Sequence, residues 1–427
     1  MTLSYAVRRR PPRRDVGSPL PASYLAWLAA ATVSQLGDVV LGFSVGWVAA
    51  DHGGTAAGLV LAAGSLPSVL LLLLGGTIAD RFGARRVMIA GDAVMLAASL
   101  GLALAVLHPG TPLWLLLAAG VVRGVVFAFY SPSAGSMPRR LVADAQLTRA
   151  LALRQGAAQT VLLLGAPLAG ILVAAGGLGS VALLDAGTFL VVLVVLLLVR
   201  PRYTTPPSDR GVPVWRAALD GVRVVYRTPG LVSALTLLAG AAAFLLPTMS
   251  LVLPLLARDA GWSAAATGVV AGAQGVGIVV ITVVVARRGG ARRPGVAASG
   301  GLAVAALGQV GLVVAATTSA GVATPAGEWA TVAAAGLVGA GSGLFTSHLG
   351  PVVLGSAPRT HLARVQALVG FVQVLAVTLT NAVLGALASA TSPAAAGGVC
   401  ALGLLGCATA GAVALRRLTL DPVESAQ

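Results

Sequence analysis

Long apolar runs separated by short polar segments dominate the pattern of hydrophobic and polar positions along this chain. A helix needs about 20 consecutive apolar residues to cross the hydrocarbon core of a bilayer. The runs that reach this length cover residues 24–48, 55–79, 87–107, 112–131, 156–175, 178–199, 230–256, 264–286, 295–317, 329–351, 364–388 and 393–415. The pattern therefore predicts an all-α integral membrane protein with twelve transmembrane helices.

The longest polar stretch, rich in proline and arginine, divides these runs into six and six. It is expected to be a cytoplasmic linker that ends in a short interfacial helix near residues 215–226. The organisation that we predict is a tail at 1–21, a six-helix bundle at 22–199, a linker at 200–229, a second bundle at 230–415 and a tail at 416–427.

An internal repeat supports two related halves. Residues 79–86, after the second run, have the sequence ADRFGARR, and residues 286–293, after the eighth run, have the sequence ARRGGARR. The two segments agree at all but two positions and occupy equivalent loops of the two halves. Parallel repeats of this kind build transporters whose substrate site lies between the halves near the membrane midplane.

The distribution of charged residues predicts how the protein is oriented in the membrane. The charged fraction is 10% and the apolar fraction 57%, which is typical of a protein with many spans. The chain has no lysine, and all 28 basic residues are arginines. On this topology, every arginine except Arg123 and Arg258 lies on one membrane face. The positive-inside rule places that face, and both chain ends, in the cytoplasm of a cell whose plasma (inner) membrane holds the protein.

The distribution of the arginines also indicates which kind of molecule they contact. Although the net charge is +15, the arginines are spread over loops between apolar runs, where they would meet anionic lipid headgroups rather than nucleic acid.

The first apolar run follows several arginines but is too long for a cleavable signal, so it is expected to be a retained helix. Cys400 and Cys407 form neither a disulfide framework nor a metal cluster. No nucleophile or phosphate-binding pattern is present, so we expect no catalytic residues, cofactor or metal.

One loop carries the most specific motif. Residues 76–86 have the sequence GTIADRFGARR, with the motif positions Gly76, Asp80, Arg81, Gly83, Arg85 and Arg86. This segment resembles the loop between the second and third helices of the major facilitator superfamily. The resemblance implies two six-helix bundles around a central cavity that open alternately to the two sides (the major facilitator fold). It also implies that the loop latches the cytoplasmic gate in the outward-facing state. The alternative is that the arginines only anchor the loop on the cytoplasmic side.

Further stretches are similar to the drug- and siderophore-exporter branch of that family, with its macrolide-efflux and enterobactin-exporter-like members. They include residues 34–38, 137–142 and 165–170. The last, with Gly165, Pro167 and Gly170, resembles the antiporter motif of the fifth helix but departs from it at Ala166. The resemblance implies export of a lipophilic drug, antibiotic-like compound or siderophore by proton antiport.

Ionisable residues inside spans are rare and suggest function. Asp38 and Arg123 each lie about 10 residues, or roughly 15 Å, from the outer end of their spans, near the midplane. In the resembled fold, their two helices border the central cavity. Our hypothesis is that Asp38 is the proton-coupling carboxylate and that Arg123 is its charge partner or a substrate contact. The alternative is a static ion pair that holds two helices together.

The other charges have simpler explanations. For Asp92 and Asp185 we expect hydrogen bonds between helices or at the membrane interface, and Asp92 is also a candidate to support Arg81 or Arg86 at the gate. Arg258 is expected to pair locally with the adjacent Asp259.

Phenylalanines fall in the four spans that would line the cavity in this fold. They are Phe43, Phe127, Phe129, Phe244 and Phe345. An aromatic wall suits a lipophilic substrate, although helix packing explains the same residues.

The sequence thus predicts a monomeric transporter whose partners are the lipid bilayer, a lipophilic substrate and protons. The first alternative is uptake or facilitated transport of a small metabolite by the same fold. The second, of another class, is a non-transporting membrane sensor or scaffold, for which the linker is too short to supply a soluble domain.

Overall fold

The computed structural model describes residues 19–107, 110–201, 203, 223, 225–228, 230–318, 325–356 and 362–414. Within these residues the regular structure is entirely helical, which confirms the predicted fold class. The N-terminal half contains α1 (Ala22–Ala50), α2 (Gly54–Phe82), α3 (Ala84–Ala105), α4 (Leu113–Leu141) and α5 (Asp144–Leu198). The C-terminal half contains α7 (Leu231–Pro247), η1 (Thr248–Val252), α8 (Leu253–Asp259), α9 (Ala264–Arg288), α10 (Pro294–Thr318), α11 (Pro325–Ser356), α12 (Leu362–Ala390) and α13 (Pro393–Ala414). The predicted tails and almost all of the predicted linker lie outside the described residues.

The described helices are sufficient for twelve membrane crossings. In the described residues, 11 helical segments are long and apolar enough to span, and one of them, Ala145–Leu198, has 54 residues. At 1.5 Å per residue it would be about 80 Å long, far more than the hydrocarbon core of about 30 Å. It turns back at Gly177, whose φ of 67° lies in the left-handed region. This segment therefore supplies both the fifth and the sixth crossings.

The seventh crossing is interrupted by a π-helical turn. α7 ends at Pro247, η1 follows, and α8 has Pro254 in its first turn. Because proline has no backbone N–H, it cannot bond the carbonyl one turn earlier, and a wider turn accommodates the break. Together α7, η1 and α8 form one span, which carries Arg258 at its far end.

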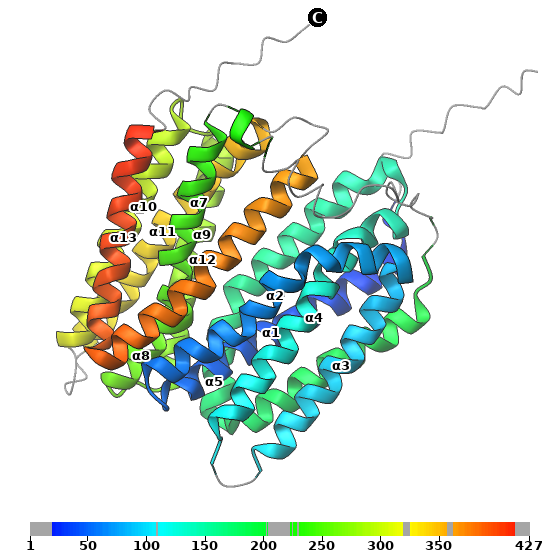
Figure 1. Cartoon of the computed structure of the whole chain (residues 1–427), viewed down its shortest axis with the longest axis horizontal. Helices are drawn as coiled ribbons and strands as arrows, with labels where there is room; N and C mark the ends of the chain where they lie inside the picture. Colours follow the sequence, from blue (N-terminus) through cyan, green and yellow to red (C-terminus); the bar gives the residue numbers. More distant parts are fainter. Residues whose placement is uncertain are drawn as a thin grey trace, which may run out of the picture.

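The two halves form two bundles that meet at one end and diverge toward the other (Figure 1). We call the meeting end, where the turns at 51–53 and 391–392 lie, the closed end, and the opposite end the open end. At the closed end α2 packs on α12, and a Cβ at Gly54 would lie 2.7 Å from the carbonyl oxygen of Gly385. α5 packs on α9, and a Cβ at Gly170 would collide with the carbonyl oxygen of Ala264. Backbone contact between the halves, which glycine makes possible, therefore seals this end.

The open end carries the first residues of α1 and α5. The Tyr24 hydroxyl donates a hydrogen bond of 2.6 Å to the carbonyl oxygen of Ala150 and ties these two helices together. The turn between α2 and α3 lies at this end too, where Gly83 has a φ of 88°. A Cβ at Gly83 would meet nothing within 4 Å, so the backbone conformation, not crowding, favours glycine there.

Candidate functional site

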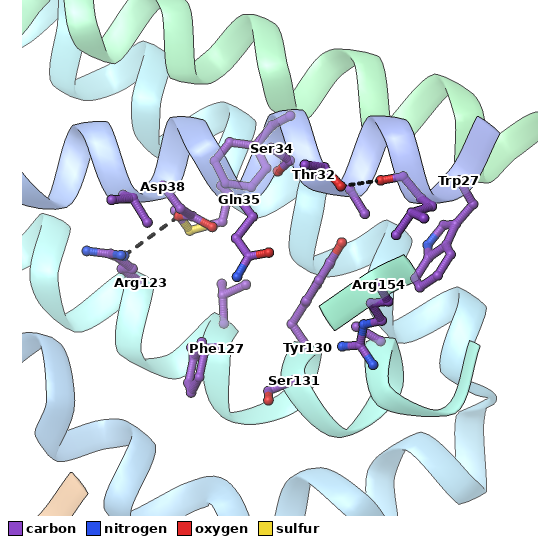
Figure 2. Close-up of a pocket in the computed structure, with 17 residues that line it drawn as sticks. Trp27, Thr32, Ser34, Gln35, Asp38, Arg123, Phe127, Tyr130, Ser131 and Arg154 are labelled. Carbon is purple, nitrogen blue, oxygen red and sulfur yellow. Dashed lines mark hydrogen bonds and ion pairs between the residues drawn. The ribbon is translucent and has the colours of Figure 1, made fainter. Parts of the chain in front are cut away.

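The centre of the site is an ion pair between Asp38 of α1 and Arg123 of α4. Arg123 Nε lies 3.7 Å from Asp38 Oδ1, and Figure 2 shows the two side chains pointing toward each other. The Asp38 side chain is 33% exposed and the Arg123 side chain 42% exposed. The structure thus brings together the two residues that the sequence singled out, and it places both on a cavity wall.

The cavity that contains both charges, called here the first cavity, has a volume of about 300 Å³ and lies inside the N-terminal half. Its polar wall is formed by side chains of α1, α4 and α5, with Trp27, Tyr130 and Phe189 as aromatic neighbours. The polar residues are Thr32, Ser34, Gln35, Asp38, Arg123, Tyr130, Ser131 and Arg154. The first cavity is therefore lined by hydrogen-bonding groups, one carboxylate and two guanidinium groups.

A second cavity adjoins the first and has a volume of about 470 Å³. Met95, Arg123 and Phe127 line both cavities, so Arg123 lies at their junction. Most of the second wall belongs to α1 to α4, while Leu246 of α7 and Val374 of α12 close it from the C-terminal half. This space therefore reaches the boundary between the halves.

Arg154 is a cavity residue that the sequence did not reveal. It lies just before the fifth apolar run and was expected on the cytoplasmic face. α5 begins at Asp144, however, and carries the Arg154 side chain into the first cavity beside Tyr130. Hydropathy marks the membrane-embedded part of a helix and misses its extension beyond, so it gave no signal for this residue.

The remaining intramembrane carboxyl groups bridge helices. Asp185 of α5 is buried and accepts a 2.7 Å hydrogen bond from the Ser99 hydroxyl of α3, which confirms the expected interhelical contact. Asp92 of α3 is also buried and accepts a long, 3.5 Å bond from the Tyr130 hydroxyl of α4. These contacts fix α3 against its neighbours. Support of the gate by Asp92 stays a prediction.

The gate loop makes contacts within the N-terminal half. Arg85 Nε donates to the carbonyl oxygens of Leu196 (2.8 Å) and Val199 (3.1 Å), and Nη2 donates to that of Leu197 (3.0 Å). Arg85 therefore caps the C-terminus of α5, a role that the motif did not predict.

The other motif positions are less constrained. The Arg81 guanidinium lies 5.7 Å from the ring centroid of Phe82, and Arg86 is exposed. Gly76 and Asp80 belong to the α2 backbone, but their contacts are outside what the structure describes. The latch role of the loop stays a prediction.

The fifth-helix motif lies at helix contacts. A Cβ at Gly165 would collide with Val39 of α1, whereas Pro167 packs against Gly272 of α9. Gly170 contacts α9 as well, as described above. Two of the three motif residues therefore belong to the interface between the halves.

The predicted aromatic wall is sparser than expected. Among the five phenylalanines, Phe127 lines both cavities and the others line neither. Phe345 is 2% exposed in the core of the C-terminal half, and Phe244 packs on Gly403 of α13. Phe43 packs against the core beneath the closed end. Phe129 is partly buried in α4.

Arg258 makes a contact that the sequence did not indicate. Its Nη2 lies 2.8 Å from Asp51 Oδ2, and its guanidinium carbon lies 3.9 Å from the centroid of the Trp47 ring. The expectation of a local pair with Asp259 is wrong. Adjacent residues on a helix point in different directions, so Arg258 reaches the other half of the molecule instead.

Two bundles of apolar helices, with an ion pair and cavities inside, have the architecture of a membrane transporter. The chain matches the family model of the Major Facilitator Superfamily over residues 27–324, and it belongs to that family.

Related proteins agree on this class. The chain is 22% identical over 239 residues to macrolide efflux protein A of Streptococcus pyogenes, a match that covers 55% of this chain and 58% of that protein. It is also 22% identical over 197 residues to macrolide efflux protein A of Enterococcus faecalis, covering 46% and 61% of the two chains. The matches therefore span little more than half the length of these relatives.

Solved structures share the fold. The nucleoside transporter NupG has a TM-score of 0.71 at 12% identity, covering 92% of this chain and 99% of that one. The POT family transporter PepTSo has a TM-score of 0.71 at 15% identity, covering 93% of this chain and 98% of that one. A bacterial homologue of the lysosomal transporter Spinster, in an inward-facing and unoccupied conformation, has a TM-score of 0.66 at 16% identity, covering 95% and 96%.

Proposed function

We propose that this protein is a secondary active transporter that exports a lipophilic small molecule across the plasma membrane by proton antiport. Asp38 is the proton-coupling carboxylate in this proposal, and Arg123 is its charge partner. The two halves rock about the site, so that it faces each side of the membrane in turn.

The observation that carries the proposal is the geometry of the Asp38–Arg123 pair. Charge-assisted N–H···O bonds in locked pairs are about 2.7–2.9 Å long, whereas this separation is 3.7 Å. Both side chains are also partly exposed to the first cavity. A pair that is close, yet neither tightly bonded nor shielded, can exchange its partner for a proton or a substrate. This argues against a static ion pair that only holds α1 and α4 together.

The orientation follows from the arginines. Arg81, Arg85 and Arg86 lie at the open end, together with Arg287 and Arg288 at the equivalent turn of the other half. The positive-inside rule puts this end in the cytoplasm, and with it the start of α1 and the end of α13. The closed end is then extracellular, and the conformation described here is the cytoplasm-open state from which an exporter would load substrate.

The second cavity supports a lipophilic substrate. Cavities of 300–1,000 Å³ with mostly apolar walls and a few polar groups are typical of small-molecule sites, and the second cavity, with a volume of about 470 Å³, fits this description. The relatives named macrolide efflux protein A favour export.

The proposal is tested with inverted membrane vesicles that contain the protein. A pH gradient, acidic inside, should drive uptake of at least one member of a panel of radiolabelled lipophilic compounds that includes a macrolide. Asp38→Asn should abolish the gradient-dependent part, because it removes the titratable group. Asp259→Asn is the matched control, since its exposed carboxylate lies at the closed end, away from both cavities.

Other outcomes point to the alternatives. Transport of a compound at a rate that does not depend on the pH gradient would indicate facilitated transport. If no compound is transported in vesicles of either orientation, a sensor or scaffold would be favoured. Gradient-driven transport that survives Asp38→Asn would remove Asp38 from the coupling role.

A further inference from the structure

The first and second cavities differ sharply in the chemistry of their walls. In the first, Gln35 is exposed to the cavity, and neither Gln35 nor Arg154 has a hydrogen-bond partner among the described residues. Ser131 is likewise unbonded within the described part of the chain. These groups are available to a ligand.

In the second cavity the serine hydroxyl groups already donate hydrogen bonds within the protein. The Ser68 hydroxyl donates to the carbonyl oxygen of Gly124 (2.9 Å), the Ser99 hydroxyl to Asp185 (2.7 Å), and the Ser65 hydroxyl to the carbonyl oxygen of its own helix one turn earlier (3.1 Å). The remaining lining is aliphatic, glycine, Met95 or Phe127, except for Arg123. To a ligand, the second cavity therefore offers an apolar surface.

Arg123 connects the two environments. Its Nε faces Asp38 in the first cavity, while its Nη1 lies against Gly42 on the wall of the second, 2.5 Å from where a Cβ would stand. A molecule that occupied both cavities would pass this guanidinium group.

We infer that the substrate is a two-part, amphipathic molecule. Its polar, hydrogen-bonding head binds in the first cavity beside Gln35, and its bulky apolar body fills the second cavity between Gly64 and Gly120 on one side and Val374 on the other. The inference rests on the proposed function, since it names the chemical class of the exported compound.

Val374 is the informative position because α12 brings it to the second cavity from the opposite half. Val374→Phe should shrink this cavity without disturbing the packing of α1 to α4. Val383→Phe is the matched control: it makes the same change on the same helix at a position that is 66% exposed and lines neither cavity. Leu246→Trp, on α7, fills the second cavity independently if Val374→Phe does not fold.

The test uses two probes with the same carboxamide head, 4-phenylbutanamide and 4-(1-pyrenyl)butanamide. Their dissociation constants are measured by calorimetry on the full protein in lipid nanodiscs, with empty nanodiscs subtracted. The wild type should bind the pyrenyl probe at least tenfold more tightly. Val374→Phe should weaken pyrenyl binding at least tenfold and phenyl binding less than twofold, whereas Val383→Phe should change neither.

A variant of the first cavity completes the design. Gln35→Ala should weaken both probes by the same factor, because it removes a contact to the shared head. A Val374→Phe effect that is independent of probe size, no effect at Val374 and Leu246, or failure of the wild type to bind the pyrenyl probe would each overturn the inference.

The two proposals fail separately. Size-dependent binding without pH-driven transport would contradict the export function but retain the two-part site. Transport driven by the pH gradient, together with a Val374→Phe effect on binding that is the same for both probes, would support the export function but contradict the two-part site.

Discussion

Arg258 of the C-terminal half holds Asp51 of the N-terminal half at 2.8 Å, directly across the closed end of the molecule. The same guanidinium group lies over the Trp47 ring and 3.4 Å from the Trp47 carbonyl oxygen. Partly exposed ion pairs and cation–π contacts contribute up to about 1 kcal/mol each. Together these contacts favour the conformation with this end closed by up to about 30-fold over one in which it is open.

Arg258→Gln should therefore shift the protein toward the state that is open at this end. The measurement is the rate at which an impermeant maleimide, added from outside, labels a cysteine introduced at Val45, which lines the second cavity. In a background with Cys400 and Cys407 replaced by alanine, labelling should accelerate several-fold.

The controls for this clamp use the same region. Asp51→Asn should act like Arg258→Gln, and the exchanged pair Asp51→Arg with Arg258→Asp should restore slow labelling. Asp259→Asn removes a neighbouring exposed carboxylate and should change nothing. Equal labelling in all these variants would show that the clamp does not bias the gate.

Gly170 tests the backbone seal of the closed end. Valine at this position would press on the Ala264 carbonyl of α9, so the closed end could not pack, and transport should fall at least tenfold. Gly156→Val is the control on the same helix, since a Cβ there meets nothing within 4 Å. Full transport by Gly170→Val would mean that the contact between α5 and α9 is not required.

A substitution of Arg85 distinguishes a helix-capping role of this residue from a role as a lipid anchor only. Arg85→Gln removes hydrogen bonds to three carbonyl oxygens at the end of α5 and should cost about 1–2 kcal/mol, because partial exposure weakens such bonds. The melting temperature of the protein should fall by a few degrees. The neighbouring Arg86→Gln, which has an exposed side chain, should leave the melting temperature unchanged. Equal effects of the two variants would contradict the capping role.

Much of this architecture follows from the sequence. Apolar run length fixes the number of crossings, because a bilayer of constant thickness demands a constant helix length. The same argument predicts that Asp38 and Arg123 lie near the midplane, and the resemblance to the family implies that their helices both border the central cavity. The structure agrees on the apolar helices and brings the two side chains together on the wall of one cavity.

Contacts between distant segments could not be predicted in this way. The partner of Arg258 is 207 residues away in the chain, and nothing in local spacing indicates it. Arg154 was hidden because its helix begins before the apolar run does. Phe345 was expected at the cavity because its helix borders the cavity in this fold, yet helical rotation turns it into the core.

Asp185 should behave differently from Asp38. Its carboxyl group is buried and bonded to Ser99, away from the first cavity, so Asp185→Asn should retain proton-driven transport. Ser99→Ala removes the donor and should destabilise the protein by about 1 kcal/mol. Ser136→Ala is the control, since that hydroxyl bonds only a carbonyl of its own helix. Loss of proton coupling in Asp185→Asn would make this carboxyl group part of the coupling site.

The central claim is that substrate and proton movements are coupled through Asp38. The most direct measurement uses proteoliposomes with a pH-sensitive dye inside and no initial pH gradient, to which a gradient of a transported compound is applied. The wild type should move protons against the compound, whereas Asp38→Asn should move none. Proton movement that is unchanged in Asp38→Asn, or compound transport by the wild type without any proton movement, would contradict the account.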